Sequence, residues 1–98
     1  MPPAEAWRTL ANTFHSLPRL VDANKLPVDY GPDEAIDLYR NVPLSSTERS
    51  LLSFLLHVWN HYDFTFDLSE TLIWDMKHKK AFLNWVNGKT LGQPCRYF

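Results

Sequence analysis

The feature that most constrains this chain of 98 residues is a capped amphipathic helix near its centre. It begins at the pattern Ser-Ser-Thr-Glu, where the Ser45 side chain can accept a hydrogen bond from the Glu48 backbone N–H and the Glu48 side chain can reach back to the Ser45 amide. The apolar residues that follow recur at three- and four-residue spacing, the period of one helix face. The sequence therefore predicts a core helix from Ser46 to about His61.

This central helix has an apolar and a polar side. The apolar side consists of Leu51, Leu52, Leu55, Leu56, Val58, Trp59 and Tyr62, with Phe54 at its boundary. The polar side consists of Ser46, Arg49, Ser50, Ser53, His57, Asn60 and His61. Because most of these polar side chains are small or neutral, another helix can approach them closely, so Arg49, Ser53 and His57 are candidate partner-binding residues. A face that is only solvated is the alternative.

The residues before the central helix carry two further helix signals. Trp7, Leu10 and Phe14 lie at helical spacing and predict a first helix from about Pro3 to Ser16, which Pro18 ends. Residues 17–31 have no clear period and predict a long loop, which either packs against the domain, the interpretation we favour, or binds a partner. A second, short helix is predicted from Pro32 to about Arg40, because proline suits the first helical position and the next two residues are acidic.

The residues after the central helix predict two more helical segments and a tail. Asp67 can cap a short segment that ends near Ile73, and Asp75 can cap a last helix that ends near Asn87. In that last helix His78, Phe82, Trp85 and Val86 are expected to face inward, and Lys77, Lys80, Asn84 and Asn87 outward. Residues 89–98 read as an irregular tail. We expect one all-α domain over residues 1–98, with four to five helices and an antiparallel central pair that starts near Ser46 and Asp75.

Charge is distributed unevenly along the chain. The 11 acidic residues all lie in the first 75 positions, together with only five of the 10 basic residues. The other five basic residues, which we count as candidate partner-binding residues, are Lys77, Lys79, Lys80, Lys89 and Arg96. This polarity is typical of a surface that meets an acidic partner.

Reaction chemistry has little support in these residues. His57 and His61 have the spacing of a metal-binding pair, but they lack an accompanying CxxC or HExxH motif. Ser53 and His57 lack the orienting carboxylate and Gly-rich elbow of a hydrolase. We therefore expect no enzyme activity and no cofactor, and metal binding by the two histidines is left open.

The expected compartment is the cytoplasm. The single cysteine, Cys95, cannot form an internal disulfide, the first seven residues lack the pattern of a secretory signal, and the most apolar window is too short to span a membrane.

A resemblance adds a biological context. Residues 54–60 form an apolar helix that ends in Asn60, and a Phe-Thr-Phe-Asp-Leu segment and a Trp-Asp helix start follow it. Over about residues 47–88 this order resembles an uncharacterised family of small helical domains encoded on phages and integrative elements of bacteria. The family has no assigned catalytic residues. The resemblance implies an accessory protein of a mobile genetic element, a setting in which small inhibitors of host defence are common.

The resulting hypothesis is a non-catalytic protein-binding module that inhibits a host defence complex such as a CRISPR effector. Its partner would be a larger host protein or ribonucleoprotein complex with an acidic surface. The alternative is a small nucleic-acid-binding regulator that uses the basic residues after Asp75, with Trp74, Trp85 and Tyr97 available to stack on bases. A homo-oligomer is compatible with both.

Overall fold

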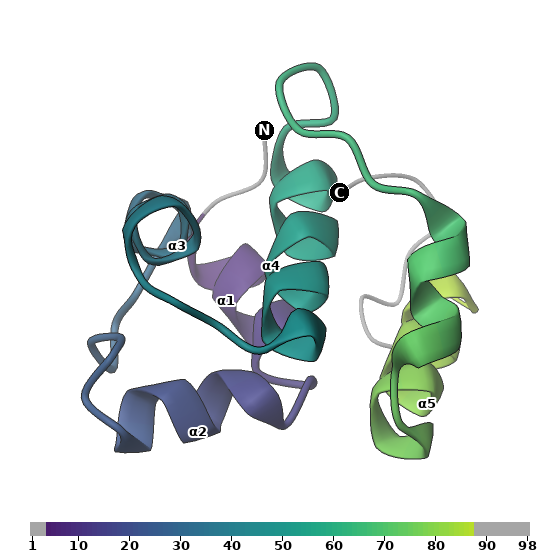
Figure 1. Cartoon of the computed structure of the whole chain (residues 1–98), viewed down its shortest axis with the longest axis horizontal. Helices are drawn as coiled ribbons and strands as arrows, with labels where there is room; N and C mark the ends of the chain where they lie inside the picture. Colours follow the sequence, from purple (N-terminus) through teal and green to yellow (C-terminus); the bar gives the residue numbers. More distant parts are fainter. Residues whose placement is uncertain (1–3, 88–98) are drawn as a thin grey trace.

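The computed structural model describes residues 4–87 and contains only helices in this range (Figure 1). The α-helices are α1 (Ala4–Ala11), α2 (Ser16–Asp22), α3 (Pro32–Asn41), α4 (Ser46–Trp59) and α5 (Met76–Val86), and the 3-10 helix η1 (Leu68–Ile73) precedes α5. The all-α fold class is therefore confirmed. The predicted irregular tail, residues 89–98, lies outside the described residues.

The central helix α4 begins as its sequence predicts. Ser45 Oγ accepts a hydrogen bond from the Glu48 backbone N–H at 3.1 Å, and Glu48 Oε1 accepts one from the Ser45 backbone N–H at 3.0 Å. The helix ends at Trp59, two residues earlier than expected, and the turn after it carries Tyr62 into solvent, where this side chain is 87% exposed. The assignment of Tyr62 to the buried side was therefore wrong.

The neighbours of α4 differ from the expected central pair. The helix whose backbone packs most closely along α4 is α3, and η1 also lies against it. The last helix, α5, reaches α4 through aromatic side chains. The ring centroid of Phe54 lies 5.4 Å from those of both Phe82 and Trp85. Edge-on packing of this kind adds to the free energy gained by burying the rings.

The first predicted helix ends early, at Ala11, and a second helix, α2, begins at Ser16 and continues into the predicted loop. Pro18 does not end a helix but occupies the first turn of α2, where the backbone N–H groups have no partner within the helix in any case. The end of α2 is marked by Asn24, whose φ of 62° is left-handed, and by a hydrogen bond from the Lys25 N–H to the Leu20 carbonyl at 2.9 Å. The predicted loop over residues 17–31 is thus correct only for its second half.

The remaining loop packs tightly against α1, as expected. Leu26 and Tyr30 are buried, and the Tyr30 hydroxyl donates a hydrogen bond to Asn12 Oδ1 at 2.6 Å. Arg8 Nη1 donates to the Tyr30 carbonyl at 2.9 Å. Burial raises the pKa of the Tyr30 phenol well above its usual value, against a smaller opposing effect of Arg8. The burial of Leu26 and Tyr30 and these hydrogen bonds therefore explain why the loop packs against α1.

Polar caps also mark the starts of α3, η1 and α5. The Gly31 N–H donates to Glu34 Oε1 at 2.6 Å at the start of α3. Asp67 Oδ1 accepts from the Ser69 N–H at 2.9 Å and opens η1, and Asp75 Oδ1 accepts from the His78 N–H at 2.9 Å and opens α5. These carboxylate caps confirm the helix starts predicted at Asp67 and Asp75.

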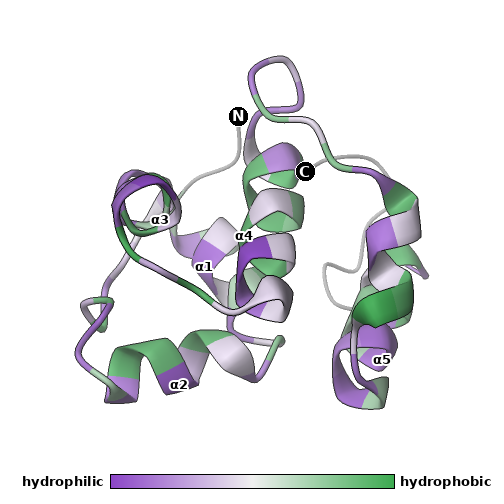
Figure 2. Ribbon diagram, in the orientation of Figure 1, coloured by the Kyte–Doolittle hydropathy of each residue, from purple (hydrophilic) through white to green (hydrophobic). Residues whose placement is uncertain are grey.

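Hydrophobic residues are not confined to the interior. Figure 2 colours parts of η1 as hydrophobic, although none of the residues of this element is buried. None of the helices between residues 4 and 87 combines the length and apolar character needed to cross a membrane.

Candidate functional site

An exposed apolar surface covers η1 and the outer side of α5, and we call it the η1–α5 face. It consists of Leu68, Leu72, Ile73, Met76, Leu83 and Val86. Met76 and Leu83 are seven residues apart, so they lie on the same side of α5 and are 78% and 56% exposed. The opposite side of this helix carries buried His78, Ala81 and Trp85. The expectation that Val86 faces inward was wrong.

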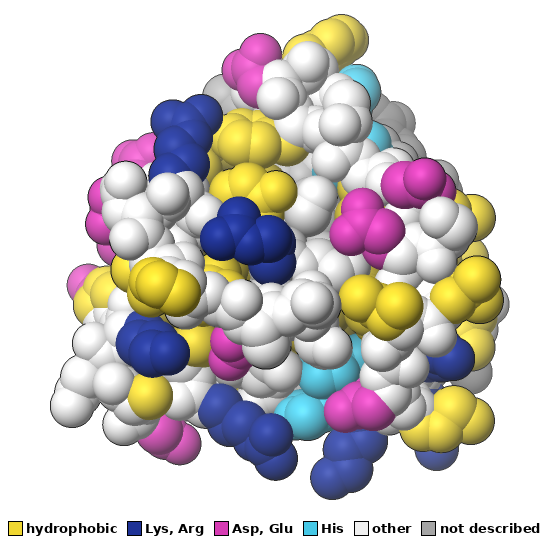
Figure 3. Space-filling view, in the orientation of Figure 1, with side chains coloured by type: hydrophobic (Ala, Val, Ile, Leu, Met, Phe, Trp, Pro, Cys, Tyr) yellow, Lys and Arg dark blue, Asp and Glu magenta, His cyan; other side chains and the backbone are white. Residues whose placement is uncertain are grey.

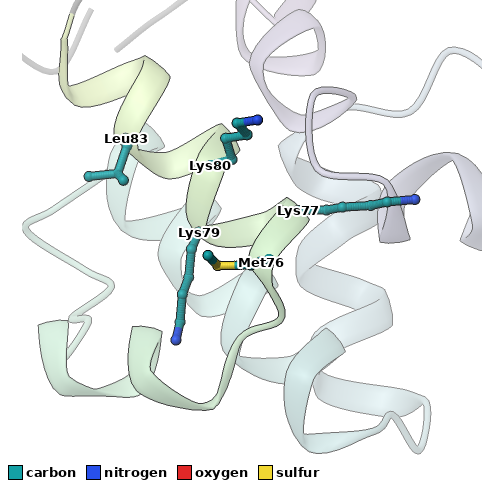
Figure 4. Close-up of a pocket in the computed structure, with 5 residues that line it drawn as sticks. All are labelled: Met76, Lys77, Lys79, Lys80 and Leu83. Atoms are coloured by element: carbon teal, nitrogen blue, oxygen red, sulfur yellow. The ribbon is translucent and has the colours of Figure 1, made fainter.

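A shallow hollow of about 350 Å³ lies on this face and is lined by Met76, Lys77, Lys79, Lys80 and Leu83 (Figure 4). In Figure 4 the side chains of Met76, Lys79 and Leu83 project from one side of α5, whereas Lys77 extends in the opposite direction. The hollow therefore combines the apolar side chains of Met76 and Leu83 with three lysines of the same helix.

The chemistry of the η1–α5 face follows from this combination. Lysine side chains lay their methylene groups along apolar surface and keep the charged end in water. No acidic residue follows Asp75 in the sequence, so no carboxylate on α5 neutralises Lys77, Lys79 and Lys80. Figure 3 shows hydrophobic side chains gathered at the edge of the molecule where η1 and α5 lie. Such a surface is suited to a segment that offers both apolar side chains and carboxylates.

The other candidate partner-binding residues are not on this face. Arg49, Ser53 and His57 lie on α4, and Lys89 and Arg96 lie outside the described residues. The guanidinium of Arg49 donates to the Tyr39 carbonyl at 3.1 Å and sits over the Tyr39 ring. These contacts tie Arg49 to α3.

The polar side of α4 is occupied by the chain itself. Ser53 Oγ donates to the Thr65 carbonyl at 3.2 Å, and His57 Nδ1 lies 2.9 Å from the Phe64 carbonyl oxygen. Ser50, also expected on this polar side, is buried. Small polar residues therefore let the chain after α4 fold back against this helix, and we leave Ser53 and His57 out of the surface proposed below.

The aromatic residues near the lysines are not available for stacking. Trp74 and Trp85 are 3% and 6% exposed and belong to the core, and Tyr97 lies outside the described residues. The alternative hypothesis, in which Trp74 and Trp85 are available to stack on nucleic-acid bases, is therefore wrong about these two side chains.

A second polar constellation joins the start of α2 to the start of α5. His15 Nε2 lies 3.1 Å from Asp75 Oδ2, and His78 Nδ1 lies 2.8 Å from Asp75 Oδ1. The rings of the two histidines stack with centroids 4.0 Å apart. On its other side, His78 Nε2 lies 3.0 Å from Ser16 Oγ. Histidine and acidic side chains meet at the lower surface in Figure 3.

The protonation of this constellation is biased toward a neutral His78 and an ionised Asp75. Burial lowers the pKa of His78, and the adjacent His15 lowers it further, against the attraction of Asp75. The hydrogen bond from the His78 backbone N–H is the main cause that lowers the pKa of Asp75. Both shifts favour a neutral imidazole beside an ionised carboxylate.

Ser16, His78 and Asp75 have the order of a serine hydrolase relay but not its geometry. His78 Nδ1 lies 2.8 Å from Asp75 Oδ1 but makes no hydrogen bond within residues 4–87, and Ser16 is only 8% exposed. Sequence reasoning missed this group because His15 and His78 are 63 positions apart and neither belongs to a motif.

Comparison of the chain with family models, with curated proteins and with solved structures found no match in any of the three. The functional argument therefore depends on the residues and surfaces of this molecule.

Proposed function

We propose that this protein is a non-catalytic binding module that docks through its η1–α5 face onto an acidic surface of a larger protein. The observation that supports this is the hollow in which Met76 and Leu83 lie beside Lys79 and Lys80. Apolar patches rimmed by polar residues commonly mark interaction sites on soluble proteins. Apolar contacts at the centre of such a site supply most of the affinity, and the charged rim orients the partner.

Charge complementarity selects the kind of partner. Within α5 every charged side chain is basic, whereas residues 1–75 hold 11 acidic and five basic residues. An acidic partner is therefore attracted to α5 and repelled by the rest of the molecule. The partner segment that fits has apolar side chains flanked by aspartate or glutamate.

A finer proposal concerns the biological setting. The resemblance to helical domains of phages and integrative elements covers residues 47–88, which include the whole η1–α5 face. It supports a cytoplasmic accessory protein that blocks a host defence complex, such as a CRISPR effector ribonucleoprotein, by covering an acidic surface of that complex.

The test compares the partners captured by four variants of the full chain. Met76→Glu and the double variant Lys79→Glu/Lys80→Glu alter the face. On a distant loop, Val28→Glu makes the same charge change as Met76→Glu, and Lys25→Glu reverses the charge of one lysine. Val28 is 81% exposed and thus matches Met76 in exposure. We expect one stoichiometric protein from host lysate to bind the wild type and both loop variants and to be lost from both face variants. Equal capture by Met76→Glu and Val28→Glu would remove the proposal.

Two further measurements separate the remaining possibilities. Retarded migration of DNA or RNA that weakens steeply with salt, and that is lost in Lys79→Glu/Lys80→Glu, would favour the nucleic-acid regulator instead. A wild-type dimer in sedimentation equilibrium that Met76→Glu converts to a monomer would show that the face joins two copies of this chain.

A further inference from the structure

We propose that His15, Asp75 and His78 form a binding site for a divalent transition-metal ion of the zinc class. One ligand atom from each residue lies within 4.8 Å of the other two. Three ligands at 2.0–2.1 Å from a tetrahedral ion are roughly 3.3 Å apart. His15 Nε2 lies 3.1 Å from Asp75 Oδ2 and His78 Nδ1 lies 2.8 Å from Asp75 Oδ1, so each imidazole is near this separation from one of the two carboxylate oxygens.

The strongest sign of a ligand is the buried nitrogen of His78. This side chain is 2% exposed, and its Nδ1 has no hydrogen-bond partner within residues 4–87. Asp75 Oδ1 is near, but its position is set by the hydrogen bond it accepts from the His78 backbone N–H. A buried nitrogen without a partner is costly, and a cation between this nitrogen and the carboxylate would satisfy both.

Ser16 supplies the support that a metal-binding histidine needs. A histidine that binds a metal through one ring nitrogen commonly donates the N–H of the other to a nearby oxygen, which fixes its tautomer. Ser16 Oγ lies 3.0 Å from His78 Nε2 and can accept this hydrogen bond. The Nδ1 atom, 2.8 Å from Asp75 Oδ1, then carries the free electron pair that can bind the ion.

The exposed side of the site, formed by His15 and Asp75, is where the ion would enter and where the His15 ring would change its orientation. The side chains of His15 and Asp75 are 29% and 54% exposed, so an ion can enter from solvent. The two imidazole rings are now stacked at an angle of 18°. Because a metal binds in the plane of each ring, His15 must tilt away from His78 when the ion enters. His15 lies in the link between α1 and α2, outside both helices.

The donor set selects the metal. Two imidazoles and one carboxylate suit zinc and its neighbours, whereas magnesium and calcium prefer oxygen atoms alone. Three protein ligands leave a fourth position for water. The bound ion would tie the start of α2 to the start of α5 and so hold the helix that carries the η1–α5 face. The site does not depend on the partner proposed above.

The test is a titration of the metal-free full chain with zinc chloride, followed by calorimetry and by thermal unfolding. All chains carry Cys95→Ser so that the thiol cannot bind the ion. We expect one zinc ion per chain and a raised melting temperature, because the ion binds only the folded form. His15→Gln should abolish both effects at zinc concentrations that saturate the parent, and Ser16→Ala should weaken the affinity about 10- to 100-fold.

His61→Gln is the matched control, because it removes an exposed histidine from the other candidate pair. It should leave binding and melting temperature unchanged. Stoichiometric binding that survives His15→Gln, or that His61→Gln removes, would place the site elsewhere and overturn the proposal. Absence of any zinc-dependent shift in the parent would overturn it equally.

Discussion

Trp74 donates its indole N–H to the hydroxyl of Ser50 across 2.9 Å, and both side chains are buried. This contact joins the residue between η1 and α5 to the middle of α4. A buried indole N–H needs an acceptor. Serine provides one, and its side chain is small enough to leave space for the indole ring beside α4. Ser50 is therefore a specific anchor for the C-terminal part of the domain.

Replacing Ser50 by alanine should lower the free energy of unfolding by about 1–3 kcal/mol, because the Trp74 N–H loses its buried acceptor. Ser53→Ala is the matched control, since it makes the same change of helix propensity on the same helix. Its hydroxyl is less buried, and the expected loss is below about 1 kcal/mol. Urea denaturation measures both values, and equal losses would contradict a special role for Ser50.

Phe54 is the centre of the aromatic cluster that attaches α5 to α4. Its ring lies within 6 Å, centroid to centroid, of the rings of Phe14, Phe66, Trp74, Phe82 and Trp85. Phe54→Ala should lower the free energy of unfolding by about 3–5 kcal/mol, and Phe54→Leu by less, because leucine fills part of the cavity. Chemical denaturation of the two variants measures both losses. If the ring were peripheral, Phe54→Ala would not lose more stability than Phe54→Leu.

The capping box of α4 provides a third prediction. Ser45→Ala removes the acceptor of the Glu48 N–H and should lower the free energy of unfolding by about 1 kcal/mol. The neighbouring Ser46→Ala lies inside the helix and makes no cap, so its effect should stay within about 0.5 kcal/mol. Thermal unfolding that shifts equally in both variants would contradict the assignment of Ser45 as the cap.

Asp67 should make a small contribution to acid unfolding. The backbone N–H and hydroxyl of Ser69 lower the pKa of Asp67 below 3.8, because both donate to the ionised carboxylate. The stabilisation is therefore complete above the unfolded pKa and is lost as the pH falls through the lower, folded pKa. Asp67→Asn keeps a cap but does not titrate. The stability difference between wild type and this variant should shrink between pH 5 and pH 2, and a constant difference would contradict the assignment.

Local signals in the sequence predicted several elements correctly. The capping residues Ser45, Asp67 and Asp75 mark real helix starts, because a cap acts on backbone N–H groups only two or three residues away. Pro18 misled the prediction because proline is acceptable in a first turn and disruptive in a helix interior, and the sequence does not say which of the two applies.

The candidate surfaces were predicted less well. Lys77, Lys79 and Lys80 were identified from charge, but the apolar residues beside them were not, because exposure depends on which side of η1 and α5 meets the core. The functions proposed for Ser53 and His57 assumed that the polar side of α4 faces outward, but the segment that follows α4 folds back and contacts both residues.

Sequence alone determined the all-α class, the three capped helix starts and the concentration of basic charge after Asp75, because each is a matter of neighbouring residues or of composition. Tertiary structure decided what those elements meet. It placed the Ser50 hydroxyl against Trp74 and brought His15 to His78 over 63 positions of chain. Contacts between residues this far apart in the sequence depend on how the helices pack around one core, and no local sequence pattern specifies that packing.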